Sequence, residues 1–267
     1  TRLRNTLRKL AKEGTEGRLW YEKSGQAILK IAGGNLKRAR KLAGLFAIYS
    51  SGTAVSANTT NALKMWARFY GTEQIVPPKS GTLAGRFSEQ DRTAIEWLNS
   101  NEDDAHHVET FGNKRFPFFV NIMREIDPKN YDTGQGVTVD LWMMRALGYD
   151  QGAPTDAQYA FASSEIMLIA KEMGWENQQA QAAIWVAIKA RWEFIQKKAK
   201  DKAVKLGLAE YTPMKKGAPL FDVVGNSREE QIENEKKIIG VFRDMALKVS
   251  AADLTKKLEE SKADFAD

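Results

Sequence analysis

Apolar residues recur at every third or fourth position along nearly the whole chain, which is the spacing of one face of an α-helix. The clearest stripe follows Asn35, a residue type that favours helix N-termini. Its apolar members are Leu36, Ala39, Leu42, Ala43, Phe46 and Ala47. Basic residues stand between them, so we expect an amphipathic helix with an apolar inner face and a basic outer face.

Similar spacing predicts helices through most of the remaining chain. The expected ranges are 58–70, 91–99, 116–126, 140–147, 155–173, 177–200 and 227–267. Capping residues mark two expected helix starts, one at Asp140 and one at Thr155 or Asp156. Glycines mark two expected helix ends, at Gly148 and Gly174. Stretches rich in glycine, proline and small polar residues predict loops over 75–87, 127–136 and 209–227. We therefore predict an all-α protein with a core over 1–149, a boundary near 150–154 and a C-terminal helical region over 150–267.

Composition narrows the class of protein. Hydrophobic residues make up 43% of the 267 positions, which is ordinary for a globular chain. No apolar run of about 18 residues occurs, so we expect no membrane partner, and no secretory signal is recognisable. The absence of cysteine excludes disulfides, thiolate catalysis and cysteine-ligated zinc or iron–sulfur centres. These features lead us to expect an intracellular protein.

Positive charge is concentrated near the N-terminus. The whole chain carries a net charge of +6, whereas residues 1–48 hold twelve Lys or Arg and three Glu, a local balance of 12 − 3 = +9. The densest group is Lys37, Arg38, Arg40 and Lys41. Such a concentration favours a polyanionic partner, nucleic acid in particular. The alternative is a basic helix surface that serves only solubility.

Two later segments contain residue types that can act together chemically. In the first, Gly112 permits a tight turn that opens a helix, and Lys114 falls in the first helical turn, where an apolar wall would favour the neutral amine. In the second, Val137–Asp140 leads into a helix whose first backbone N–H groups can bond to the Asp140 carboxylate. An amine can attack the anomeric carbon of a nucleotide as its base leaves, while a carboxylate stabilises the positive charge on the sugar.

These segments resemble the catalytic stretch of the helix-hairpin-helix DNA glycosylase superfamily. Gly112 matches the second glycine of the family's hairpin, Lys114 its Schiff-base lysine, and Asp140 its catalytic aspartate. Arg145 and the Ala-Leu-Gly after it match the helix that follows the aspartate. Upstream, residues 46–58 are similar to the family's Leu-Ser-x-Gln-x-Thr segment, which lines the DNA side of its cleft. The resemblance spans roughly 36–149 and extends to uncharacterised bacteriophage proteins.

The resemblance implies a two-lobed helical fold with a C-terminal helical extension. It also implies a double-stranded DNA partner, no cofactor, and excision of a flipped base with Lys114 as nucleophile and Asp140 as stabilising carboxylate. Together with the charge pattern, it points to a set of DNA contacts. These are Arg38, Lys41, Ser50, Lys64, Arg68, Gly112 and Arg115. The aromatic candidates for the wall of a base pocket are Phe46, Phe111 and Trp142.

Some positions depart from the family pattern. Glu109-Thr110 replaces the Pro-Gly of the hairpin, and Gly52 replaces the Gln of the upstream segment. Lys114 and Asp140 are 140 − 114 = 26 positions apart, several more than is usual. A non-catalytic DNA-binding module of the same fold therefore stays open, with Lys114 a solvated lysine and Asp140 a plain N-cap. A structural or interaction protein of a bacteriophage is a further alternative.

No metal site is expected. His106 and His107 follow an acidic turn at 102–104, but adjacent side chains on a helix point about 100° apart and rarely share one metal ion. With two His and no Cys, the chain lacks the usual ligands of a catalytic zinc. It also lacks a phosphate-binding loop motif and a Gly-x-Ser-x-Gly nucleophile motif.

Overall fold

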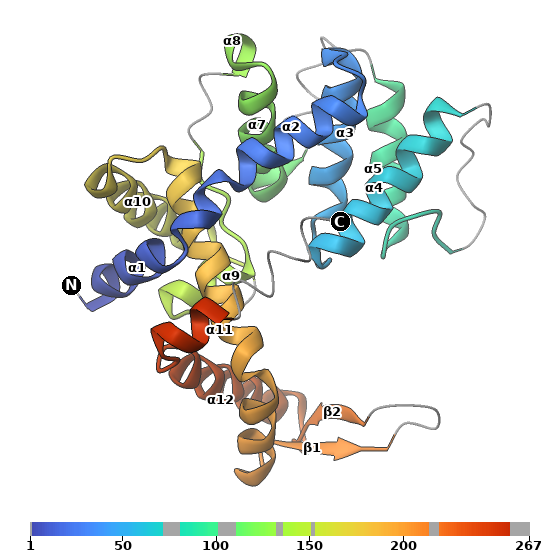
Figure 1. The fold of residues 1–267 in the computed structure, drawn as a ribbon. Helices are drawn as coiled ribbons and strands as arrows, with labels where there is room; N and C mark the ends of the chain where they lie inside the picture. The colour runs from blue at the N-terminus through green and yellow to red at the C-terminus, as the bar shows by residue number, and fades with distance from the viewer. Residues whose placement is uncertain are drawn as a thin grey trace. The chain divides into compact units, whose positions relative to one another are not determined.

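The structure is a computed structural model that describes residues 2–71, 81–100, 111–131, 136–150, 153–213 and 219–256. Helices dominate these residues, which confirms the predicted helical class (Figure 1). The chain forms two compact units. One, the α3 unit, contains helix α3 (Leu36–Tyr49) and comprises Leu19–Thr138 and Trp175–Gln179. The other, the α11 unit, contains most of helix α11 (Asn177–Lys205) and comprises Thr1–Arg18, Val139–Gly174 and Ala180–Asp267.

Helix α3 is the centre of the α3 unit. It packs against four neighbours, which are α2 (Trp20–Ile31), α4 (Val55–Tyr70), α5 (Ser88–Asn99) and α7 (Gly112–Ile126). A single turn, α8 (Pro128–Tyr131), follows α7 and packs against it. Most of the predicted stripe on α3 is buried, whereas Leu36 at its first turn is 47% exposed. The 3.6-residue period of the sequence thus decides which face of α3 enters the core.

Several helices of the α3 unit begin earlier than predicted: α4 starts at Val55 and not at residue 58, and α5 starts at Ser88 and not at residue 91. Asn35 caps α3 as predicted, because its side chain accepts a hydrogen bond from the backbone N–H of Arg38. Helix α7 begins at Gly112 and not at residue 116. Pro117 is the sixth residue of α7, so it lies inside the helix, where a proline cannot donate the usual backbone N–H bond to the residue four positions earlier. The loop predicted over 127–136 contains α8, so that prediction was wrong for Pro128–Tyr131.

The contact between α3 and α5 depends on Gly44. A Cβ atom at this position would lie 2.1 Å from Nε1 of Trp97, a side chain that is 1% exposed. Gly-to-Ala in a helix interior ordinarily stabilises by up to about 1 kcal/mol. Here we expect Gly44→Ala to lower the free energy of unfolding by about 1–3 kcal/mol, because the overpacked Trp97 must move.

Chemical denaturation followed by circular dichroism measures this change, and Gly240→Ala is the matched control. Gly240 lies inside helix α12 (Arg228–Ala246), and a Cβ there would meet no atom within 4 Å. The control substitution should leave the protein as stable or more stable. Equal effects of the two substitutions would show that the Gly44–Trp97 approach is unimportant.

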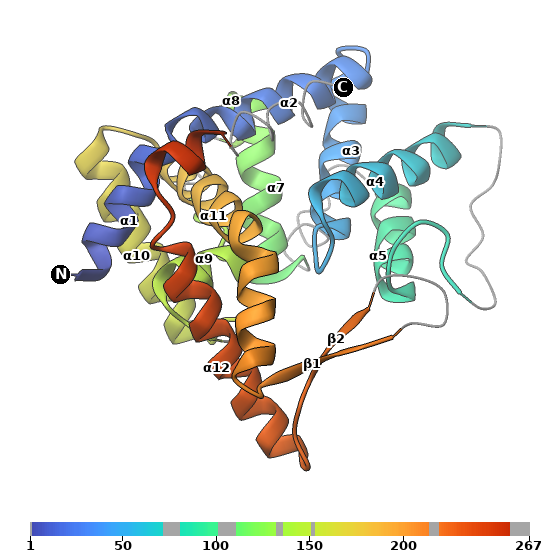
Figure 2. The ribbon, with the colours of Figure 1, turned by 60° about the horizontal axis from the view of Figure 1, so that its bottom comes forward.

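The α11 unit is built from helices and one hairpin. Its elements besides most of α11 are α1 (Arg2–Glu13), most of the short 3-10 helix η1 (Thr15–Leu19), α9 (Leu141–Leu147), α10 (Asp156–Met173), α12, β1 (Ala209–Thr212) and β2 (Leu220–Val223). Helix α12 crosses behind α11 in Figure 1 and descends next to it in Figure 2. The two helices share a buried cluster to which α11 contributes Trp192 and Ile195 and α12 contributes Ile238 and Phe242.

Capping predictions in the α11 unit are confirmed. Asp140 caps α9, and Thr155 caps α10 in a reciprocal arrangement with Gln158. Gly148 and Gly174 end these two helices in the left-handed conformation, with φ of 90° and 68°. These features depend only on residues a few positions apart, which is why the sequence predicts them well.

The segment 209–227 was predicted to be largely loop, and this was wrong for eight of its residues. β1 and β2 form an antiparallel pair in the register Ala209↔Val223 to Thr212↔Leu220 (Figure 2). Each strand has only four residues, too short for a periodic pattern to stand out among Pro213, Gly217 and Pro219. The strands are stabilised by pairing with each other, which is a contact between positions about ten residues apart.

The domain boundary near residue 149 stays a prediction. The compact units of the structure change between Arg18 and Leu19 and between Thr138 and Val139, and the short segment Trp175–Gln179 belongs with the α3 unit. Lys114 therefore lies in the α3 unit and Asp140 in the α11 unit.

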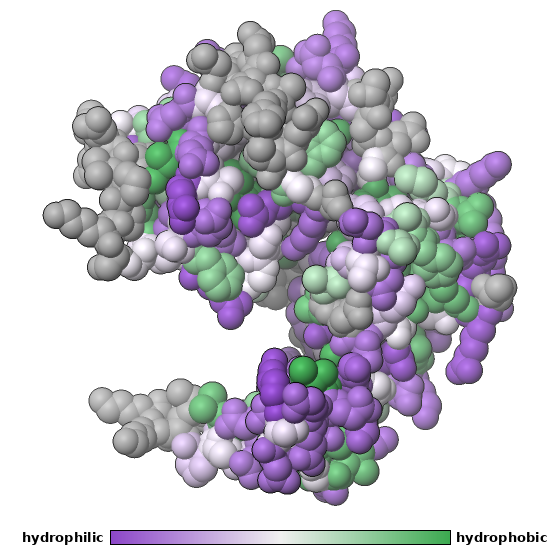
Figure 3. Space-filling model, turned by 180° about the vertical axis from the view of Figure 1, so that it is seen from behind, coloured by the Kyte–Doolittle hydropathy of each residue, from purple (hydrophilic) through white to green (hydrophobic). Residues whose placement is uncertain are grey.

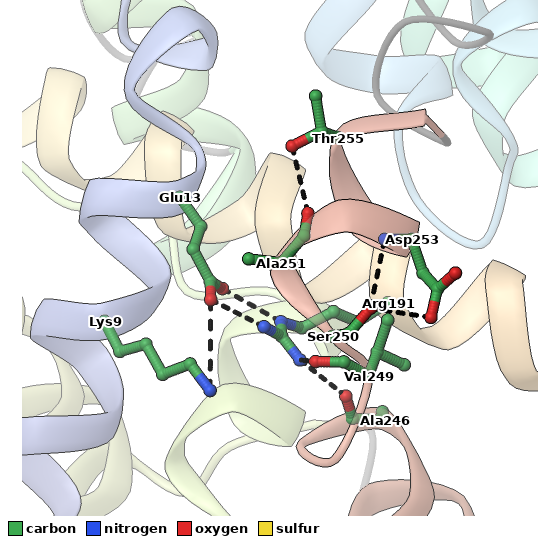
Figure 4. Close-up of polar contacts among 9 residues, drawn as sticks. All are labelled: Lys9, Glu13, Arg191, Ala246, Val249, Ser250, Ala251, Asp253 and Thr255. Carbon is green, nitrogen blue, oxygen red and sulfur yellow. Dashed lines mark hydrogen bonds and ion pairs between the residues drawn. The ribbon is translucent and has the colours of Figure 1, made fainter.

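A buried ion pair links three helices of the α11 unit. Arg191 of α11 is 1% exposed, and its Nε and Nη2 donate to the two oxygens of Glu13 on α1 at 2.9 and 2.6 Å (Figure 4). Its Nη1 donates to the carbonyls of Ala246 and Val249, at the end of α12 and just beyond it. One guanidinium thus satisfies a carboxylate and two backbone carbonyls.

Candidate functional site in the α3 unit

The C-terminal end of α3 opens into a tight turn formed by Ser50, Ser51 and Gly52, which we call the Ser50 turn. Ser50 ends the helix and donates its hydroxyl to the carbonyl of Ala47 at 2.8 Å. Gly52 has a φ of 67°, a conformation that favours glycine. The positive φ therefore explains why a glycine stands at this position, where the helix-hairpin-helix DNA glycosylases have Gln.

Three cationic side chains converge on the Ser50 turn, one for each of its residues. Lys114 Nζ donates to the carbonyl of Ser50 at 3.3 Å, and Arg115 Nε donates to the hydroxyl of Ser51 at 3.2 Å. Arg86 Nη1 donates to the carbonyl of Gly52 at 2.9 Å. We call Lys114, Arg115 and Arg86 the basic cluster. The structure thus brings together two predicted residues, Lys114 and Arg115, and adds Arg86, which sequence reasoning missed.

Among the described residues, little negative charge offsets the two arginines of the basic cluster. Arg86 and Arg115 form no ion pair with a carboxylate in the part of the chain that the structure describes. Burial lowers the pKa of Arg115 from its usual value, and the only opposing influence comes from Glu89. Glu89 itself pairs with Arg92 at 3.1 Å. A partly buried guanidinium without a carboxylate favours an anionic ligand, because an anion would compensate its lost solvation.

The loop that carries Arg86 is held by two buried polar residues of α5. Gln90 Oε1 accepts hydrogen bonds from the backbone N–H groups of Arg86 and Phe87, and Gln90 Nε2 donates to the carbonyl of Ser51 at 3.1 Å. Asp91 is 2% exposed and accepts from backbone N–H groups of residues 83–85 and from the hydroxyl of Tyr49. The position of Arg86 is therefore fixed by the protein.

An exposed aromatic ring lies next to Arg86. Phe87 is 50% exposed, and the guanidinium of Arg86 lies over its ring at 5.2 Å. A Cβ added to Gly52 would lie 3.9 Å from this ring, so the ring borders the Ser50 turn. Aromatic rings beside cations are typical of nucleic-acid-binding surfaces, where they stack on bases.

Helix α7 begins at Gly112 with the open turn that the sequence predicts. Gly112 is exposed, has a φ of 74°, and a Cβ there would meet no atom within 4 Å. No side chain caps α7, because its N-cap is Phe111. Phe111 therefore gives the first N–H groups of α7 no side-chain cap, and the helix dipole at this end favours anions.

In the α11 unit, Asp140 is held by three N–H donors. Its Oδ1 accepts from the backbone N–H groups of Trp142 and Met143 at 2.9 and 3.1 Å, and its Oδ2 accepts from Nε1 of Trp185 at 2.9 Å. The role of N-cap is confirmed. The contact with Trp185, 45 positions away, could not be read from the sequence.

Two groups near Asp140 have altered acidity. Burial lowers the pKa of Arg145 to about 10, and the Asp140 carboxylate opposes this shift. Burial raises the pKa of Tyr159 to about 12, the hydrogen bond from Val139 N–H lowers it, and Asp140 raises it.

Arg145 lies over the rings of Trp142 and Trp192 at 4.5 and 4.2 Å. Trp142 therefore packs at the margin of the core, and its role in a base pocket stays a prediction.

Two predicted site residues are corrected by the structure. Lys41 is 4% exposed, and its Nζ donates to the carbonyls of Trp97 and Ser100 at 2.6 and 2.8 Å, so it cannot serve as a surface phosphate contact. Phe111 is 5% exposed and packs edge-on against Trp97 and Phe119, so it is a core residue and no pocket wall. Both side chains face inward because both pack against the ring of Trp97.

For the other predicted site residues of the α3 unit, the roles as DNA contacts or as a pocket wall stay predictions. Arg38, Lys64 and Arg68 are exposed on α3 and α4, and the guanidinium of Arg38 lies over the ring of Tyr70 at 5.3 Å. Phe46 is half-buried on α3. Glu109-Thr110, His106 and His107 lie outside the described residues. Within the described part of the chain, no group of three possible metal ligands comes together.

Comparison with known proteins places most of the chain in one family. A family model described as a family of unknown function (DUF7178) matches residues 9–192. No curated protein and no solved structure matches the chain. None of the helices in the described residues is long and apolar enough to span a membrane.

Proposed function

We propose that this chain, which belongs to the DUF7178 family, binds double-stranded DNA through the α3 unit and excises a flipped base. The observation that carries the proposal is the basic cluster, in which Lys114, Arg115 and Arg86 all bond to the Ser50 turn. A backbone carbonyl and a hydroxyl position Arg86 and Arg115 without neutralising their charges. Positioned cations beside a helix N-terminus whose N-cap residue makes no side-chain cap suit the phosphates of a nucleic acid.

The chemical step of the proposal uses Lys114. Lys114 first gives up its extra proton to water, and its neutral amine then attacks the anomeric carbon. The N-glycosidic bond breaks, and its electron pair leaves with the base, which takes up a proton that the attacking nitrogen loses. The sugar ring then opens, its ring oxygen takes up a proton from water, and an iminium remains between Lys114 and the sugar. In this reaction the Asp140 carboxylate stabilises the positive charge that develops on the sugar. The three N–H groups that hold Asp140 suit this role, because they favour a fixed, charged carboxylate.

A non-catalytic DNA-binding module is the second candidate. The observation that favours it is the hydrogen bond from Lys114 Nζ to the Ser50 carbonyl, which gives the amine a structural role. In this case the basic cluster would bind phosphates, and no bond of the DNA would break.

We expect the basic cluster to determine the salt dependence of DNA binding. For duplex DNA, removing one cation that binds a phosphate lowers the slope of log K against log salt by about 0.9. The double variant Arg86→Gln, Arg115→Gln should therefore lower the slope by about 1.8 and weaken binding to all sequences alike. Fluorescence anisotropy with a labelled duplex at several salt concentrations measures both effects.

Arg228→Gln provides the matched control, since Arg228 is an exposed arginine at the start of α12 in the α11 unit. Its substitution should leave the slope unchanged. An unaltered slope in the double variant would contradict binding through the Ser50 turn, and an absence of salt-dependent binding in the unaltered protein would contradict DNA binding altogether.

A further inference from the structure

Helix α10 is apolar on two opposite faces. Its inner face is buried in the α11 unit, where α10 packs against α1 and α9, and includes Ile166 and Ile169. On its outer face Phe161, Met167 and Leu168 are 43%, 37% and 39% exposed. Hydrophobic residues gather on the surface over α10 in Figure 3, at the right of the view. A helix with one face in water normally has polar residues there, so the outer face of α10 has the character of a contact surface.

The exposed apolar and small residues of α10 form one continuous stripe. Ala157, Phe161, Ser164 and Leu168 follow one another at intervals of four, three and four residues, an average of about 3.7, which keeps them on one side of an α-helix. Every exposed residue between Asp156 and Lys171 is uncharged. The exposed face of α12 in the same unit differs sharply, because charged residues dominate it. These include Glu229, Glu230, Glu233, Glu235, Lys236 and Lys237.

We propose that the outer face of α10 binds the same face of a second copy of this chain, with the two helices antiparallel and crossing at Ser164. The residue pattern is complementary to itself about that point. Phe161 of each copy then meets Met167 and Leu168 of the other, and the small Ser164 side chains allow the helices to approach closely. An isologous contact of this kind needs no second surface.

Charge at the two ends of the face specifies the antiparallel direction. Asp156 begins α10 and Lys171 lies in its last turn, so an antiparallel pair brings opposite charges together at both ends, whereas a parallel pair brings like charges together. Glu172, next to Lys171, has its charge offset within the chain by Arg8 at 2.8 Å. The charges therefore favour a second copy in one orientation.

The expected dimer is weak. The face spans about 15 residues, or roughly 22 Å of helix. A pair of helices of this length buries less than the roughly 1,600 Å² of a standard interface, so we expect a dissociation constant in the micromolar range.

Sedimentation velocity of the full chain between about 1 and 300 μM tests the proposal, since this range brackets micromolar affinities. The sedimentation coefficient should rise from the monomer value toward the dimer value. Phe161→Glu and Leu168→Glu should each raise the dissociation constant by about tenfold or more, because each places a charge in an apolar contact. Leu220→Glu, at a 49% exposed position of β2, should leave it unchanged.

A charge exchange tests the direction of the helices without altering the apolar contact. Asp156→Lys alone and Lys171→Asp alone should weaken the dimer, and the double variant should restore it. A sedimentation coefficient that stays at the monomer value throughout the range overturns the proposal, as does association that Phe161→Glu leaves unchanged. Association without rescue by the double variant overturns the antiparallel arrangement. None of these results depends on DNA binding.

Discussion

Replacing Arg191 with Met should lower the free energy of unfolding by about 3–5 kcal/mol, the cost of removing one partner from a buried ion pair. The side chain is 1% exposed and bonds to both oxygens of Glu13 (Figure 4). Methionine fills a similar volume but donates no hydrogen bond. The Glu13 carboxylate and the carbonyls of Ala246 and Val249 would then remain in the interior without these donors.

Urea denaturation followed by circular dichroism measures this decrease, and two further variants isolate its cause. Arg8→Met removes an exposed pair with Glu172, whose side chains are 36% and 41% exposed, and should cost less than about 1 kcal/mol. The double variant Arg191→Met, Glu13→Leu should recover part of the stability, because it also removes the buried carboxylate. Recovery should be incomplete, since the two carbonyls still lack a donor. Equal costs for Arg191→Met and Arg8→Met would contradict the structural role of Arg191.

Replacing Lys114 with Gln should abolish covalent trapping on DNA. Borohydride reduces the iminium that the proposed reaction forms between Lys114 and the sugar, which leaves a stable protein–DNA adduct. Gln has no amine that could form this bond, so no adduct should appear on any duplex that traps the unaltered protein. Incubation with duplexes carrying different modified bases, followed by denaturing electrophoresis, gives the result directly.

Two controls separate chemistry from binding. Lys64→Gln removes an exposed lysine of α4 in the same unit and should weaken DNA binding while leaving trapping intact. Asp140→Asn keeps a residue that can cap α9 but removes the charge, and should slow adduct formation by about 10²–10³-fold. Adduct formation by the Lys114→Gln variant would exclude this lysine as nucleophile. If the unaltered protein binds duplexes and traps none of them, the non-catalytic module is the correct function.

The sequence was most informative where the determining contacts are local. Capping by Asn35, Asp140 and Thr155 involves backbone N–H groups two or three positions away, and the glycines at 148 and 174 need only their own φ. The apolar stripe of α3 follows from the 3.6-residue period alone. The same reasoning predicted the open turn at Gly112 that places Lys114 in the first turn of α7.

The sequence could not distinguish members of one charged run from one another. Arg38 and Lys41 belong to the same basic stretch, yet Arg38 is exposed and the amine of Lys41 lies in the interior. The difference arises because position 41 faces α5, where the carbonyls of Trp97 and Ser100 accept the amine's hydrogen bonds. A buried lysine of this kind is identifiable only when its acceptors are known.

By itself, then, the sequence determined the helical class, most helix ends, and the local positions of Lys114 and Asp140. Only the tertiary structure decided that Arg86, 34 positions beyond Gly52, joins Lys114 and Arg115 at the Ser50 turn. Only the structure placed Trp185 on Asp140 and paired β1 with β2. The physical reason is the range of the interactions: caps and helical periods act within a few residues, whereas the basic cluster depends on contacts between helices, which no local pattern encodes.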